Sequence, residues 1–103
     1  MMEASQATSA FGALAQNTRL QFLRALVKAG SEGLASGAFA TQFGISASSA
    51  SFHLGQLEKA GLVVSKRQSR SIIYCAHYEL IGALIRFITE DCCCNDPRII
   101  NCC

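Results

Sequence analysis

The sequence predicts a mainly α-helical fold that carries one β-hairpin, and three observations lead to this prediction. Residues 36–61 contain two amphipathic segments separated by a glycine, and residues 62–76 are rich in β-branched side chains on both sides of a polar centre. Helical spacing of apolar residues covers most of the remainder. The chain has 103 residues, of which 50% are hydrophobic, so it holds one domain with a modest core.

Two helices are expected before residue 31. Apolar residues at helical spacing over residues 5–15, including Phe11, predict a short packing helix. The stretch from Thr18 to Gln21 fits a capping box, so a second helix is expected to start at Thr18 and to end at Gly30. Its inward face contains Leu20, Leu23, Leu26 and Val27. Residues 31–33 then form a loop.

Residues 36–61 predict a helix-turn-helix. Ser36 is suited to cap a short helix, and Gly44 tolerates the positive φ that ends one. Ser46 is suited to cap the second helix, and Gly61 to end it. The second helix has one apolar stripe, formed by Ala47, Ala50, Leu54 and Leu57.

The opposite face of the second helix is mostly polar. Short donors and acceptors suit base edges and phosphate oxygens in the major groove of DNA. A solvated surface is the more common explanation for such a face on a lone helix. The candidate DNA contacts from this segment are Ser46, Ser48, Ser49, Ser51, His53 and Gln56.

A hairpin is expected over residues 62–76, with three cations at its tip: Lys66, Arg67 and Arg70. A projecting basic turn suits a wing that lies along a minor groove, although a solvated tip would look the same in isolation. Because the hairpin directly follows a helix-turn-helix, the two together predict a winged helix-turn-helix that binds double-stranded DNA.

The last helix is expected over about residues 78–91 and has a wide apolar stripe. Such a stripe exceeds what a small monomer can cover, so a homodimer is predicted. Two-fold symmetry would also place two recognition helices on one duplex. The candidate dimer contacts are Phe11, Leu80, Leu84, Phe87 and Ile88.

Charge and hydropathy narrow the function classes. Charged residues are only 16%, the net charge is +2, and the apolar runs are too short for a bilayer span, so no membrane association is expected. Before residue 90 eight Lys or Arg residues face four Glu, which gives a basic body suited to a phosphate backbone. Six cysteines without a visible secretory signal favour a reducing compartment, so a cytoplasmic location is expected.

The segments LAQNTRL at residues 14–20 and SFHLGQLEKAGLV at residues 51–63, with a wing that ends in Tyr74, resemble the arsenical-resistance repressor (ArsR) family of metal-responsive winged-helix regulators. Three departures limit the resemblance. Residues 33–38 lack the Cys-x-Cys pair of the family's founding arsenic site, and His77, Glu79 and Glu90 do not reproduce its zinc site. Ser69 replaces a usual wing glycine, so a wider hairpin is expected.

Cysteines concentrate in residues 92–103, which are expected to form a tail separate from the domain of residues 1–91. The tail looks like the family variant that binds arsenic after the last helix, and thiolates select soft ions. The expected inducer is As(III) or Sb(III), with cadmium, zinc and copper as alternatives and no organic cofactor. The sequence around Pro97 would turn the chain back. The candidate ligands are Cys92, Cys93, Cys102, Cys103 and Cys94.

Two other functions are weighed for these cysteines. A thiol-redox switch on the same fold is one. An enzyme is the other, since Cys92 to Arg98 spells Cys-x5-Arg, the spacing of cysteine phosphatases and one class of arsenate reductases. That loop requires a preceding strand and a following helix, whereas here a helix is expected before it, so no catalysis is expected. The lone Cys75 is expected to be structural, as is His77.

Overall fold

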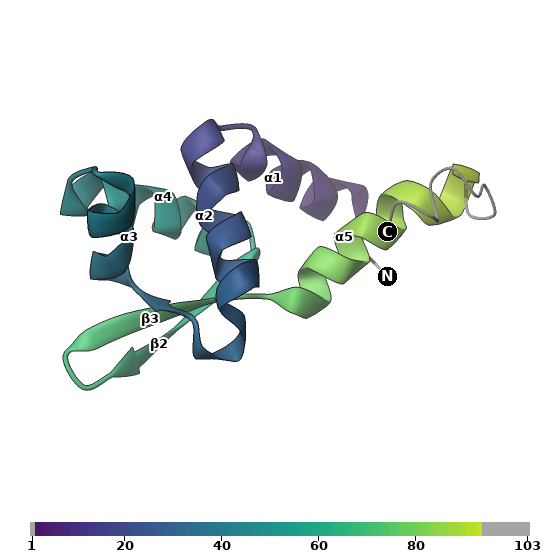
Figure 1. Ribbon diagram of the computed structural model, residues 1–103. Coiled ribbons are helices and arrows are strands. Elements are labelled where there is room, and N and C mark those ends of the chain that lie inside the picture. Colours follow the sequence, from purple (N-terminus) through teal and green to yellow (C-terminus); the bar gives the residue numbers. More distant parts are fainter. Residues whose placement is uncertain (1, 94–103) are drawn as a thin grey trace.

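Five α-helices, one 3₁₀ turn and three short strands make up the part of the chain that the computed structural model describes, residues 2–93, with side chains described up to Thr89 (Figure 1). In chain order these elements are α1 (Ala4–Leu14), α2 (Asn17–Ala29), η1 (Gly30–Glu32), β1 (Leu34–Ala35), α3 (Ser36–Phe43), α4 (Ala47–Lys59), β2 (Val63–Gln68), β3 (Ser71–Ala76) and α5 (Tyr78–Cys93). Their order and types are those of a winged helix-turn-helix, as predicted.

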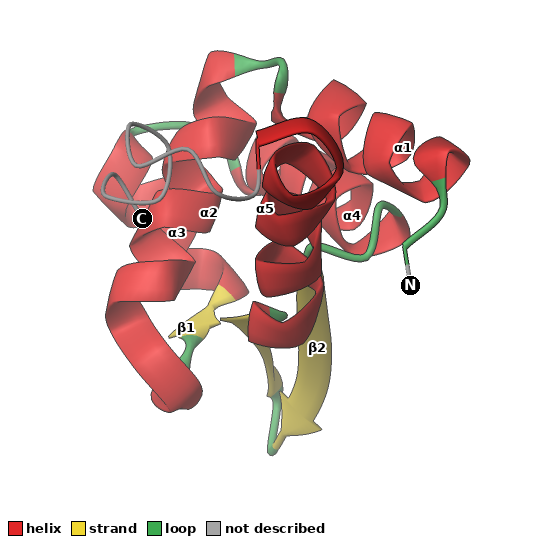
Figure 2. Ribbon diagram, turned by 90° about the vertical axis from the view of Figure 1, so that its right-hand side faces the viewer, coloured by secondary structure: helices red, strands yellow, loops and turns green. Residues whose placement is uncertain are grey.

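The three strands form one antiparallel sheet in the order β1-β3-β2. The hairpin strands are in register from Val63 opposite Ala76 to Gln68 opposite Ser71. The short strand β1, which the sequence does not predict, pairs Leu34 with Tyr74 on the other edge of β3. The helices of the body lie to one side of this sheet (Figure 2).

An aromatic cluster holds the helix-turn-helix against α2. Phe22 and Phe39 are fully buried, and their ring centroids are 4.6 Å apart. Phe43 packs on Phe22 at 4.8 Å. On α4, Leu54 and Leu57 are also fully buried, so this helix turns one face into the core. Burial of each large side chain stabilises the fold by about 1.5–3 kcal/mol, which fixes the position of α4 on the body.

The helix ends match the predicted caps only in part. Ser46 caps α4 as expected, and Gly44 takes the left-handed conformation at the end of α3 with φ of 64°. The capping box at Thr18 is wrong, because α2 begins at Asn17 and the Gln16 side chain accepts from the Arg19 N–H at 2.9 Å. Ser36 does not cap α3 either; it is the first helical residue and follows Ala35.

The wing is narrower than expected. Pairing continues to Gln68 and Ser71, so a two-residue turn joins the strands. Ser69 adopts φ of 57°, the conformation for which glycine is usually chosen. The missing glycine is therefore accommodated by backbone strain at one serine and not by a longer loop.

Helix α5 projects away from the body on the side opposite to α3 and the hairpin tip, and it contacts α1 (Figure 1). At its start, the Tyr78 hydroxyl donates to the Val27 carbonyl of α2 at 3.1 Å. It runs two residues further than the expected end at residue 91. Leu80 and Leu84 are buried in the chain's own core, while Ile85 and Ile88 are exposed. No helix in residues 2–93 is long and apolar enough to cross a membrane.

Candidate nucleic-acid interface

The first turn of α4 presents hydroxyl groups to solvent. The Ser46 Oγ accepts from the Ser49 N–H at 3.1 Å and lies 3.2 Å from the Ser48 Oγ. Ser48, Ser49 and Ser51 are all exposed. Because the N-terminal end of a helix also carries a partial positive charge, these groups together suit a phosphate or a base edge.

Two faces of α4 are clearly separated by burial. Ala50, Leu54 and Leu57 face the core, whereas Ala47, predicted to share their stripe, is exposed. With about 100° between successive residues, the direction away from the core carries Ser48, Phe52, Gly55 and Lys59. All four are exposed. This outward face is the part of α4 that a partner molecule can reach.

His53 lies on the flank of α4 and not on its outward face. The Arg19 guanidinium donates to His53 Nδ1 at 3.1 Å and, through Nε, to the Ala13 carbonyl at 2.7 Å. An edge-to-face contact with Phe22, at 6.0 Å between centroids, holds the other side of the imidazole. Burial lowers the pKa of His53 below its ordinary value of 6.5, and the nearby Arg19 charge lowers it further. Because the guanidinium donates to Nδ1, the neutral form of the ring carries its proton on Nε2.

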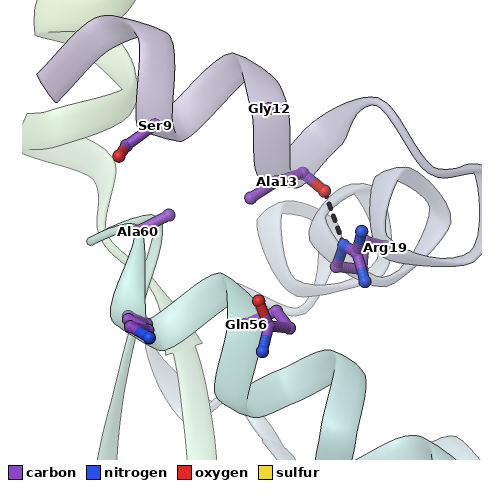
Figure 3. A pocket seen from close by; sticks show the side chains of 7 residues that line it. Ser9, Gly12, Ala13, Arg19, Gln56 and Ala60 are labelled. Atoms are coloured by element: carbon purple, nitrogen blue, oxygen red, sulfur yellow. Dashed lines mark hydrogen bonds between the residues drawn. The ribbon is translucent and has the colours of Figure 1, made fainter. Parts of the chain in front are cut away.

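Gln56 faces a hollow between α1 and α4. Figure 3 shows Gln56 and Ala60 of α4 and its C-terminal end across from Ser9, Gly12 and Ala13 of α1, with Arg19 bonded to Ala13. Lys59 also lines the hollow. The lining contains two cations and no carboxylate. Gln56 is half-buried here, so it reaches the edge of the outward face and not its centre.

The wing is tied to α4 by one short hydrogen bond. Ser65 Oγ on β2 donates to Glu58 Oε2 on α4 at 2.6 Å. Beyond Ser65, toward the hairpin tip, Lys66, Arg67 and Arg70 are all exposed. The bond fixes the middle of β2 relative to α4 and leaves the tip of the wing exposed to solvent.

Comparisons with known proteins agree with this geometry. A family model described as a helix-turn-helix domain matches residues 14–66. The HTH-type transcriptional regulator YgaV of Escherichia coli (strain K12) is 34% identical over 82 residues, which are 80% of this chain and 81% of YgaV. An ArsR-like transcriptional regulator from Rhodococcus sp. RHA1 superimposes with a TM-score of 0.76 at 27% identity, over 94% of this chain and 89% of that one. This chain belongs to the ArsR family of winged helix-turn-helix transcriptional regulators.

A second solved structure gives the same result. The homodimeric winged helix-turn-helix DNA-binding domain Mb0332 from Mycobacterium bovis, a possible ArsR-family regulator, has a TM-score of 0.68 at 28% identity, over 86% of this chain and 82% of that one. This ArsR-family chain is accordingly a DNA-binding transcriptional regulator, in which α3 and α4 form the helix-turn-helix and β2-β3 form the wing.

The predicted ion site of this ArsR-family regulator lies largely outside the described residues. Cys92 and Cys93 form the end of α5, but their side chains, and all of Cys94, Cys102 and Cys103, fall outside the description. Among the side chains that are described, no group of three or more His, Cys, Asp or Glu is placed to hold a metal ion.

Cys75 and His77 have local partners. The Cys75 thiol donates to the Ser31 carbonyl at 3.6 Å, and His77 Nδ1 donates to the Gly61 carbonyl at 3.0 Å. The His77 bond connects the start of α5 to the end of α4. Both residues therefore have contacts within the fold, and the structural roles expected for them stay predictions.

Sequence reasoning missed two residues that organise the interface. Arg19 orients His53, and Glu58 bonds the wing. Helical spacing did place Phe52 on the face opposite the buried stripe, where the structure has it exposed. The pairs of Arg19 with His53 and of Glu58 with Ser65 join different elements, so they leave no signal in local periodicity.

Proposed function

We propose that this ArsR-family regulator is a homodimeric repressor that holds its double-stranded DNA operator when free of inducer and releases it when trivalent arsenic, or antimony, binds C-terminal cysteines. The main support for an ion-binding site is that five of the six cysteines lie within residues 92–103. This segment begins at the end of α5, the helix that projects from the DNA-binding body. The DNA-binding part of the proposal follows from the family, and the inducer is the new step.

On DNA, the outward face of α4 enters the major groove and the wing follows the adjacent backbone. Ser46, Ser48, Ser49 and Ser51 supply hydroxyls, and Gln56 supplies an amide at the edge of the face. Arg67 and Arg70, with Lys66, supply the charge that phosphate contacts require. His53 reaches the duplex through Nε2, because Arg19 occupies its Nδ1.

Dimerisation is supported by exposed apolar side chains on neighbouring helices. Ile85 on α5 and Phe11 on α1 are 46% and 41% exposed, and α1 contacts α5. Leu80 and Leu84 are buried within the subunit, so they fix α5 on its own subunit. The homodimeric relative from M. bovis shares this arrangement of elements over most of its length.

Thiolates are soft ligands, and three sulfurs suit the pyramidal geometry of trivalent arsenic better than the four-ligand geometry of structural zinc. Consecutive side chains on any α-helix diverge by about 100°. We therefore propose that the end of α5 unwinds when one ion takes both Cys92 and Cys93. Cys102 or Cys103 would complete the site, with Cys94 as the spare.

Helix α5, which ends at Cys93, projects on the side opposite to α3 and the hairpin tip (Figure 1). We therefore expect ion binding to act on the operator through α5 and the dimer, with a coupling free energy of about 1–3 kcal/mol between ion and operator.

Replacing Cys92 and Cys93 together with Ser tests the proposal. Operator binding should remain, because the helix-turn-helix is untouched, but release by arsenite should be lost. The measurement is fluorescence anisotropy of labelled operator during arsenite titration, under reducing conditions that exclude disulfide switching. Single Cys102→Ser and Cys103→Ser changes then identify the third ligand.

Arg98→Ala separates the sensor from a Cys-x5-Arg enzyme. An arsenate reductase would lose its activity with this change, whereas a sensor should keep both operator binding and arsenite release. Release by arsenite that survives the paired cysteine change would contradict the proposed site and move the search to Cys75.

A further inference from the structure

We propose that Phe52 reads the methyl group of a thymine in the major groove. The inference rests on the DNA-binding role of α4 proposed above. It assigns a specificity contact to Phe52, which is not among the polar side chains proposed to contact DNA. Its basis is the position of an apolar ring at the centre of an otherwise hydrophilic DNA-facing surface.

Phe52 is 59% exposed, more than the exposed apolar residues Phe11 at 41% and Ile85 at 46%. An aromatic ring is normally among the most buried side chains of a small domain. Its described ring contact is with the neighbouring His53, edge-to-face at 5.6 Å between centroids. The ring thus contributes little to the core, and its apolar surface is available to a partner.

The surroundings of Phe52 specify the partner. Ser48 precedes it by one turn, Gly55 follows it on the same face, and the basic wing is on the next element of the chain. A protein-binding patch would be expected to continue the apolar surface around the ring. Hydroxyls, cations and a single isolated ring instead match a duplex, whose groove floor is polar except for one apolar group.

Gly55 adds an independent observation. A Cβ at this position would meet nothing within 4 Å, so packing within the chain gives no reason for a glycine. Glycine also weakens the interior of a helix. A bare backbone beside the ring does, however, allow the floor and wall of a groove to approach α4 closely.

The chemistry of the major groove then selects the base. Guanine, adenine and cytosine present donors and acceptors there, and thymine alone adds an apolar C5-methyl group. A phenyl ring has no hydrogen-bonding group, so it discriminates only by covering that methyl. His53, fixed by Arg19, supports one side of the ring and limits where the ring can point.

Uracil-substituted DNA tests the contact because uracil differs from thymine only by this methyl group. A duplex selected by the wild-type protein from a random library is resynthesised with each thymine in turn replaced by uracil. Binding of the wild type should weaken about fourfold at one thymine per half-site, the effect expected for one buried methyl group. Phe52→Ala removes the contact in both half-sites, so it should bind the thymine duplex about sixteenfold more weakly and show no further loss with uracil.

Two controls distinguish a loss of thymine recognition from a general effect on folding or on the exposed apolar surface. Val64→Ala removes another exposed apolar side chain, 47% exposed on β2, and should keep the discrimination between thymine and uracil. Gly55→Ala should raise the thermal unfolding midpoint yet weaken DNA binding, while Gly12→Ala, also with nothing within 4 Å of an added Cβ, should raise the midpoint alone.

Wild-type binding that is sequence-specific but indifferent to uracil at every position would overturn the Phe52 contact and leave the regulator function intact. Discrimination that persists in Phe52→Ala would overturn it equally. A wild-type protein that selects no duplex at all would overturn both this contact and the role of α4 in reading DNA.

Discussion

At the residue scale, Arg19 is the group that joins the most elements of the interface. Its guanidinium bonds the end of α1 at the Ala13 carbonyl and the flank of α4 at His53, while its own backbone N–H is capped by Gln16. The half-buried Arg19 charge is stabilised by two neutral acceptors, the Ala13 carbonyl and His53 Nδ1. Protonation of His53 would remove one of them and bring two positive charges together.

This pair predicts a loss of stability at acidic pH. The pKa of His53 is lowered in the folded protein, so below about pH 6.5 the unfolded chain takes up the proton first. Stability is therefore full above the ordinary histidine pKa and falls as the pH drops from there through the lowered folded value. Urea unfolding at pH 7.5 and 5.5 should show this loss for the wild type.

A His53→Gln variant provides the comparison, because glutamine can still accept from Arg19 but does not titrate. Its loss of stability between the two pH values should be smaller than that of the wild type. Equal losses in both proteins would assign the pH effect to other groups.

At the element scale, the hairpin works as a short, rigid arm. Six residues on each strand pair in register, a two-residue turn closes the tip, and the bond from Ser65 to Glu58 ties the middle of β2 to α4. Such an arm delivers cations at a fixed distance from α4. Its contribution to binding should therefore be electrostatic and nearly independent of base sequence.

Replacing Arg67 and Arg70 with Ala should weaken binding to every duplex by a similar factor. If each arginine neutralises one phosphate, the slope of log K against log salt concentration should become shallower by about 2 per subunit. An Arg24→Ala control removes an exposed cation from α2 and should leave the slope nearly unchanged. Anisotropy titrations over a range of salt concentrations measure this slope, and an unchanged slope in the double variant would refute wing contact.

At the scale of the whole molecule, the subunit is elongated, with extents of 46 × 24 × 23 Å, because α5 projects from the body. A projecting helix with exposed isoleucine is poorly explained in an isolated subunit. Pairing two such helices would cover that surface and set the spacing between two recognition helices.

Ile85→Glu should shift the protein from dimer to monomer, since a buried charge without a partner costs several kcal/mol. Operator affinity should fall with it, because one recognition helix replaces two. Val64→Glu places the same charge on the exposed hairpin and should leave the assembly unchanged. Sedimentation velocity at micromolar concentration measures the oligomeric state of each protein. A wild-type monomer under those conditions would refute the dimer.

Local rules predicted the order and type of almost every element, because apolar spacing and β-branched content can be read directly from neighbouring residues. Ser46 and Gly44 were predicted because serine is a preferred N-cap and glycine tolerates the positive φ at a helix end. The Gln16 cap was missed since glutamine is not a preferred capping residue. The two-residue strand β1 was missed because its only reason to be extended is Tyr74, far away in sequence. The flank position of His53 likewise depends on Arg19, which local patterns do not reveal.

The central place of β3 in the sheet has a consequence for how the protein is made. Leu34 enters the helix-turn-helix and Val63 leaves it, and both are fastened to the same strand, at Tyr74 and Ala76. On the ribosome, the residues of α3 and α4 are synthesised before those of β3. Until β3 is made, the segments before α3 and after α4 have no strand to pair with. Pairing Leu34 with Tyr74 then closes a loop of about 40 residues, which carries an entropic cost. Products that terminate before residue 71 would therefore leave the aromatic cluster poorly protected and should be degraded rapidly.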